Sequence, residues 1–138
     1  MNLFENSRMS RWVIALGAGF AMLAVMSGAF GAHRLKQVLD GYHLGIFETA
    51  VRYQMYHAIA LLCIGVMAAM PQFPRRWLVF ATIAFALGIA LFSGSLYLLA
   101  LSGSKWLGAI TPLGGVAFIL GWLALIVAML KRAASTIR

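Results

Sequence analysis

Acidic residues and cysteine are almost absent from this sequence of 138 residues. It has three Asp or Glu and one Cys, and 10% of its residues are charged, whereas soluble domains carry about 25%. One cysteine excludes an intramolecular disulfide framework, and we expect Cys63 to be a buried apolar thiol rather than a metal ligand. The sequence contains no paired-carboxylate site, hydrolase triad, phosphate loop or nucleotide fingerprint. We therefore expect a protein that is not an enzyme.

Charge is missing altogether from four long stretches. They are Trp12–Phe30, Tyr53–Met70, Trp77–Leu101 and Pro112–Leu130. A bilayer core about 30 Å thick needs roughly 20 mostly apolar residues in each spanning helix. The stretches are apolar on every side, which favours helices over the alternating strands of a membrane barrel. The sequence therefore predicts an all-α integral membrane protein. We expect one membrane domain over residues 1–138, with four transmembrane helices in one bundle at about 12–30, 46–70, 77–101 and 112–130.

The one long connection, residues 31–52, has a helical pattern of its own. Its apolar residues recur at spacings of three and four, and most of its polar residues fall on other faces. The apolar positions are Leu35, Val38, Leu39, Tyr42 and Ile46. This pattern predicts an external interfacial amphipathic helix at about residues 33–43, between the first and second spans.

Basic residues give the chain a net charge of +8, and they lie at the ends of the spans. They do not form one continuous face, which argues against a nucleic-acid partner and favours membrane lipid with anionic headgroups. Seven lie on the side of both termini: Arg8, Arg11, Arg75, Arg76, Lys131, Arg132 and Arg138. Four lie on the other side: Arg34, Lys36, Arg52 and Lys105. The positive-inside rule then predicts an inner-membrane protein with both termini in the cytoplasm.

Small residues recur at intervals of four or seven along three of the spans. Helices in lipid associate where small residues let their backbones approach closely. The positions are Ala24, Gly28 and Ala32 on the first span, Ala86, Ala90 and Gly94 on the third, and Gly114 and Gly121 on the fourth. They predict helix packing, either inside the bundle or in a homo-oligomer or a larger membrane complex.

Glu48 and Arg52 stand four residues apart, in the order that favours an ion pair on a helix. The pair either orients the second span or provides a carboxylate that binds a proton or cation for transport. His57 lies about one turn deeper, with Tyr53 on the same face. An ionisable group at that depth is either a hydrogen-bonded neutral histidine or a functional one.

Several polar residues fall toward the external side of the spans, where they predict a small polar or ligand-binding pocket. The candidates are His33, Glu48, Arg52, Tyr53, His57, Ser93, Ser95, Tyr97 and Thr111. A two-histidine haem or quinone site at His33 and His57 is a further alternative, although no CxxCH or HExxH motif accompanies it. We expect no metal and no cofactor.

Five short stretches together resemble the small membrane proteins grouped as domain of unknown function 423, whose eukaryotic relatives are called transmembrane protein 256. They are SGAFGAH (27–33), FETAVRYQMYHA (47–58), LFSGSLY (91–97), TPLGG (111–115) and GW (121–122). The resemblance implies a four-helix integral membrane protein, in bacteria of the inner membrane, with no assigned activity. It marks His33, Glu48, Tyr53, His57, Ser93, Ser95, Tyr97, Thr111 and Pro112 as motif positions without giving any of them a role.

Two functional hypotheses follow from the sequence. The first is a non-enzymatic protein that acts through helix packing with itself, a membrane complex or lipid. The second is a small transporter, or a lipid- or small-molecule-binding membrane protein, that uses Glu48 and His57.

Overall fold

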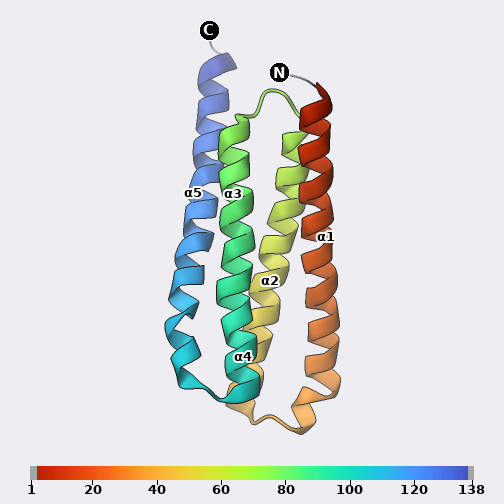
Figure 1. The fold of residues 1–138 in the computed structure, drawn as a ribbon, viewed down its shortest axis with the longest axis vertical. Helices are drawn as coiled ribbons and strands as arrows, with labels where there is room; N and C mark the ends of the chain where they lie inside the picture. Colours follow the sequence, from red (N-terminus) through yellow and green to blue (C-terminus); the bar gives the residue numbers. More distant parts are fainter. Residues whose placement is uncertain (1–2, 137–138) are drawn as a thin grey trace.

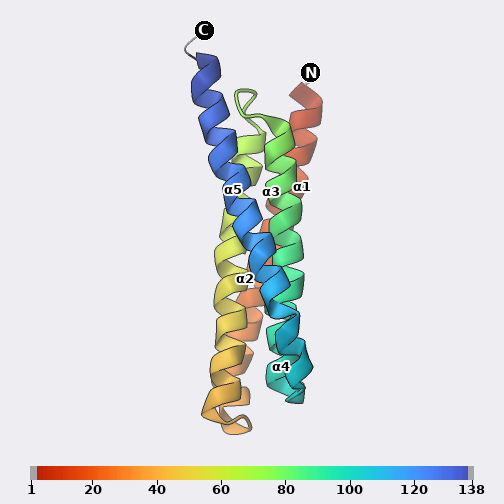
Figure 2. The same ribbon diagram turned by 90° about the vertical axis from the view of Figure 1, so that its left-hand side faces the viewer.

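Four helical rods lie side by side in the computed structural model, which describes the backbone of residues 3–136 and the side chains of residues 8–131 (Figures 1 and 2). The rods are α1 (Leu3–His33), α2 (Gly41–Ala68), a composite of α3 (Arg75–Gly88), η2 (Ile89–Ser93) and α4 (Gly94–Ser102), and α5 (Thr111–Thr136). The start of α1, the end of α5 and the α2–α3 connection lie at the same end of the bundle (Figure 1). Each rod is long and apolar enough to cross a membrane, which confirms the expected all-helical bundle of four candidate spans.

The predicted interfacial helix between the first two spans is wrong. The first helix continues to His33, and after the short 3-10 turn η1 (Leu35–Gln37) the second helix begins at Gly41 rather than near Ile46. Asp40 caps α2 because its carboxylate accepts a hydrogen bond of 2.9 Å from the backbone N–H of His43. Leu35 is buried beside Phe47 instead of facing lipid. Leu35, Leu39 and Ile46 of the apolar pattern therefore pack at the end of the bundle, whereas Val38 and Tyr42 are exposed.

The third rod contains a feature that the sequence did not indicate. Five residues of π-helix, η2, interrupt it between Gly88 and Gly94. Such a segment widens one turn by a residue and is often found at functional positions. Here it places Ser93 in the interior, where the side chain is fully buried. At the far end of the rod, Gly103 has φ 69° and its N–H bonds to the Leu99 carbonyl, which caps the helix with a left-handed residue.

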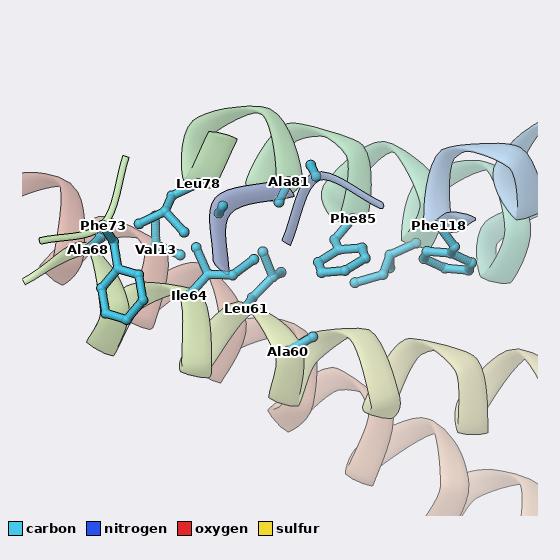
Figure 3. Packing of buried hydrophobic residues seen from close by; sticks show 13 residues of the cluster. Val13, Ala60, Leu61, Ile64, Ala68, Phe73, Leu78, Ala81, Phe85 and Phe118 are labelled. Carbon is cyan, nitrogen blue, oxygen red and sulfur yellow. The ribbon is translucent and has the colours of Figure 1, made fainter. Parts of the chain in front are cut away.

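The largest apolar core fills the half of the bundle near the α2–α3 connection (Figure 3). It joins α2 to α3 and α5 through Leu61, Ile64, Leu78, Phe85 and Phe118, and Val13 adds a contact from α1. A smaller cluster of Leu35, Phe47 and Ala100 closes the opposite end.

The first helix, α1, packs mainly along α2. A Cβ on Gly65 of α2 would stand 3.0 Å from the backbone nitrogen of Ile14, so the two backbones approach closely there. Much of the opposite face of α1 is exposed, including Trp12, Met22 and Met26. Cys63 of α2 is exposed as well, so the prediction of a buried thiol was wrong.

Candidate functional site

Most of the polar side chains predicted as site residues lie inside the bundle, where they tie one helix to another. Ser93 and Ser95 are buried, as is His57. Ser93 donates a hydrogen bond of 2.9 Å from its hydroxyl to the Ala50 carbonyl, which joins the π segment to α2. The hydroxyls of Ser95 and Thr111 are 2.8 Å apart and join α4 to the start of α5.

Gln54 connects three helices, although the sequence did not single it out. Its amide nitrogen donates to the Phe20 carbonyl of α1 at 2.9 Å. Its amide oxygen accepts from the Tyr97 hydroxyl of α4, also at 2.9 Å. Both ends of one buried side chain on α2 are therefore used, and the predicted Tyr97 belongs to this link.

His57 is held from both sides of its ring. Its Nδ1 lies 2.7 Å from the Tyr53 carbonyl, which only accepts, so Nδ1 carries the proton. Its Nε2 lies 3.2 Å from the Trp122 indole nitrogen, which only donates, so Nε2 is the unprotonated acceptor. The ring stacks on Phe118, with centroids 3.5 Å apart and planes 8° from parallel. These contacts assign a neutral histidine with one fixed tautomer.

The two histidines proposed as a haem or quinone site do not come together. His33 is exposed at the end of α1, whereas His57 is 16 residues into α2, roughly 24 Å along the helix from Gly41 at 1.5 Å per residue. Both ring nitrogens of His57 already have partners. Across residues 8–131, moreover, no group of three His, Cys, Asp or Glu side chains is placed to hold a metal ion.

Glu48 and Arg52 are exposed and do not form the expected ion pair. The Arg52 Nε lies 3.4 Å from the Glu48 backbone carbonyl instead. Among the described side chains, the carboxylate that contacts a basic side chain is that of Asp40, whose Oδ2 lies 2.8 Å from Nδ1 of His43. Glu48 and Arg52 line a hollow of about 230 Å³ between α1 and α2. Its other lining residues are Gly28, Gly31, Ala32, Phe47 and Val51.

The nine predicted residues thus divide into an inner and an outer set. The inner set, His57, Ser93, Ser95, Tyr97 and Thr111, bonds within the bundle. In the outer set, Glu48 and Arg52 share the hollow, His33 is exposed, and Tyr53 stacks on Phe92 with centroids 4.6 Å apart. The structure does not gather the two sets into one external pocket.

The sequence analysis missed the buried Gln54 and the partly exposed Trp122, whose indole nitrogen bonds to His57. Gln54 stands three residues before His57 in a stretch without charge, so it shares a helix face with the histidine. Trp122 lies in the middle of its span, unlike the tryptophans at the span ends. An amide or an indole N–H at that depth needs an acceptor, and this requirement was the available signal.

Some of the predicted small residues are buried at contacts between helices, and others are exposed. Ala24, Gly114 and Gly121 are buried, and a Cβ on Gly114 would collide with the Phe92 backbone. A Cβ on Gly28 would touch Val51 at 3.4 Å. Ala32 and Ala90 are exposed and Ala86 is half-buried. A Cβ on Gly94 would meet no atom from elsewhere in the described chain within 4 Å.

Comparison with known proteins finds the same family that the sequence motifs resemble. A family model described as protein of unknown function (DUF423) matches residues 27–115. UPF0382 membrane proteins of Staphylococcus aureus and Staphylococcus epidermidis are each 50% identical to the chain, over 121 and 118 residues, covering 86% of the chain and 94% of the relative. The UPF0382 membrane protein YwdK of Bacillus subtilis is 46% identical over 123 residues, covering 86% of the chain and 95% of the relative. No solved structure matches the chain.

Proposed function

The chain belongs to the DUF423 family of UPF0382 membrane proteins, and we propose that it acts by helix packing in the membrane rather than by catalysis. It is a bacterial membrane protein with four candidate spans. The interior polar groups support this role because they are used in bonds between its own helices. Gln54 bonds to α1 and α4 and His57 bonds to α5, and such bonds hold a helix bundle together.

The observation that carries the proposal is the outward face of the third rod. Ala86, Ala90 and Gly94 form a stripe of small residues, with Ala90 exposed and the Cβ position of Gly94 open. A Cβ on Gly94 would meet no atom from elsewhere in the described chain within 4 Å, whereas one on Gly114 or Gly121 would collide with Phe92 or Phe85. Small residues facing lipid let another helix approach closely. We infer that this face packs against a second copy of the chain or a helix of a larger membrane complex.

The same proposal includes an orientation. Seven Lys or Arg on the side of both termini, against four on the other, favour cytoplasmic termini in the inner membrane. Attachment of a membrane-impermeant reagent to single cysteines near each end of the bundle, in a Cys63→Ser background, tests this orientation. Labelling of the termini in intact cells would overturn it.

The packing proposal is tested by Gly94→Leu, with Gly19→Leu as the matched control. Neither position has an atom from elsewhere in the described chain within 4 Å of its Cβ, so both variants are expected to fold. Native mass spectrometry after extraction in native lipid is expected to show loss of the partner or oligomer only for Gly94→Leu. If the two variants keep the wild-type assembly, the third rod is not the packing face.

One observation favours a second function, the binding of a lipid or small molecule. Glu48 and Arg52 place opposite charges on the wall of the hollow between α1 and α2. Under this hypothesis Glu48→Gln abolishes function while assembly survives. Under the packing hypothesis Glu48→Gln leaves function and assembly intact, because the carboxylate is exposed and makes no ion pair among the described residues. His57 contributes to neither outcome, since its nitrogens are occupied.

A further inference from the structure

Two cations from different helices converge on one tryptophan at the membrane end that carries both termini. The Lys131 Nζ of α5 lies 5.0 Å from the centroid of the Trp77 ring, and the guanidinium carbon of Arg76 lies 5.6 Å from it. Trp77 stands in the first turn of α3 and packs against the main apolar core. The ring quadrupole attracts each cation, but the two like charges still repel each other.

No described carboxylate lies nearby to neutralise this pair. Across residues 8–131 the acidic side chains are Asp40 and Glu48, and both belong to the opposite end of the bundle. The positive end of the α3 dipole adds to the same field, and Pro74, at the N-cap, gives no side-chain bond. Among the described side chains, this corner therefore carries an excess of positive charge that suits an anion.

A hollow of about 310 Å³ is lined by Arg76, Trp77 and Phe80, and Lys131 reaches the Trp77 ring that forms part of its wall. Phe80 is four residues after Arg76, so it lies one turn deeper along α3 and extends the wall with an exposed apolar ring. The hollow thus has a charged level and an apolar level, which matches an amphiphile whose phosphate sits above its acyl chains.

The position of the two cations along their helices also favours a lipid headgroup as the ligand. Arg76 directly precedes the charge-free stretch 77–101, and Lys131 directly follows the charge-free stretch 112–130. They are therefore the charged residues nearest the hydrocarbon on their helices, at the level of lipid headgroups. Basic pockets between transmembrane helices at this level are suited to anionic headgroups.

The indole nitrogen of Trp77 lacks a hydrogen-bond partner. This Nε1 atom is buried and, alone among the buried side-chain nitrogens and oxygens of the described residues, has no hydrogen-bond partner. An unpaired buried donor costs stability, so apolar packing alone explains this tryptophan poorly.

We propose that the hollow of Arg76, Trp77 and Phe80, together with Lys131, binds the phosphate headgroup of an anionic phospholipid. The site is independent of the packing face, because Ala90 and Gly94 lie at or beyond the middle of the third rod, several turns from Arg76. A variant that loses lipid binding can therefore still be tested for assembly, and a variant that loses assembly can still be tested for lipid binding.

The test compares lipids that differ in charge on the full-length protein in detergent. Native mass spectrometry is used to titrate wild type with dioleoylphosphatidylglycerol and, separately, with dioleoylphosphatidylcholine. We expect tighter binding of the anionic lipid. The double variant Arg76→Gln/Lys131→Gln is expected to weaken it about 25-fold, because each cation near an anionic surface is worth roughly a fivefold gain in affinity. Both side chains are exposed, so the variant is expected to fold.

The matched control is Lys36→Gln/Lys105→Gln, which removes two exposed cations from the opposite end of the bundle. It is expected to keep wild-type affinity within about twofold for the anionic lipid. Equal affinity for the two lipids, or equal weakening by the two double variants, would overturn the proposal. Displacement of the bound lipid by millimolar inorganic phosphate would also overturn it, since the site would then recognise a free anion rather than a lipid.

Discussion

The Trp122 indole nitrogen lies 3.2 Å from Nε2 of His57 and so decides the state of the most deeply placed histidine in the bundle. The indole can only donate, and the Tyr53 carbonyl on the other side can only accept. His57 is therefore a fixed polar link between α2 and α5 rather than a free titratable group. We therefore expect a ligand or partner to bind at the surfaces of the bundle rather than at His57.

Replacing Trp122 with Phe is expected to destabilise the protein by about 1 kcal/mol, because Nε2 of His57 loses its donor inside the bundle. Unfolding by sodium dodecyl sulfate in mixed micelles measures the change. Trp106→Phe is the control. Trp106 is exposed in the connection between α4 and α5, so its replacement is expected to leave stability unchanged. In the wild type, ¹⁵N nuclear magnetic resonance should find the proton of His57 on Nδ1. A proton on Nε2 would contradict the assigned tautomer.

Replacing Gln54 with Leu is expected to loosen α1. The change removes the bonds to the Phe20 carbonyl and the Tyr97 hydroxyl, together worth about 1–2 kcal/mol in a membrane bundle. Tyr97→Phe removes one of the two, so its effect should be smaller, and the double variant should lose less than the sum. Hydrogen exchange along α1 checks the location of the loosening. Gln37→Leu, at an exposed position, is the control, and additive losses for Gln54 and Tyr97 would contradict the link.

Replacing Gly114 with Ala is expected to cost about 1–3 kcal/mol, because the new methyl group meets the Phe92 backbone at the π segment. Gly45→Ala provides a control of opposite sign. Gly45 lies inside α2, and its Cβ would meet no atom from elsewhere in the described chain within 4 Å. Alanine there should stabilise the helix by roughly 0.5–1 kcal/mol. Thermal unfolding in a nonionic detergent distinguishes the two, and equal shifts would argue against the close approach of α5 to η2.

The Asp40 cap predicts a specific pH dependence. Hydrogen bonds from the backbone and the ring of His43 hold the pKa of the Asp40 carboxyl below its ordinary value of 3.8. Because the folded state favours the charged carboxylate, its contribution to stability is full above the ordinary value and is lost as the pH falls through the lowered one. Asp40→Ala should therefore lower the melting temperature at neutral pH, and its difference from wild type should shrink in strong acid.

Asp40→Asn separates the two parts of this contribution. Asparagine keeps an oxygen that caps the helix but has no charge, so we expect an intermediate melting temperature and a weaker dependence on acid. A difference between wild type and Asp40→Ala that stays constant from neutral to strongly acidic pH would show that the carboxylate charge contributes nothing.

The spans were predictable because the absence of charge is a local property. Trp77–Leu101 has no Asp, Glu, Lys, Arg or His, and the structure contains one helical rod there. The loop before α2 was misjudged because Leu35 and Leu39 have helical spacing, although both pack on the bundle end. Spacing alone does not tell lipid from protein as the partner of an apolar side chain.

The candidate site was predictable only as a set of residue types. His57 and Ser93 were chosen for their depth, but their partners Trp122 and Ala50 are 65 and 43 residues away along the chain. The π segment depends in the same way on contacts with α2 and α5, and no repeat in the sequence marks it. Pairings of this kind arise from tertiary packing, which residue spacing does not contain.

The packing of α1 along α2 has a consequence for biosynthesis. These helices are consecutive in the chain, so the first two spans can pair in the membrane while the ribosome is still making the third. Tyr97 arrives later to complete the bonds of Gln54, and Trp122 arrives with the last span to complete those of His57. A nascent chain that stops before α5 therefore exposes an unsatisfied imidazole within the bilayer.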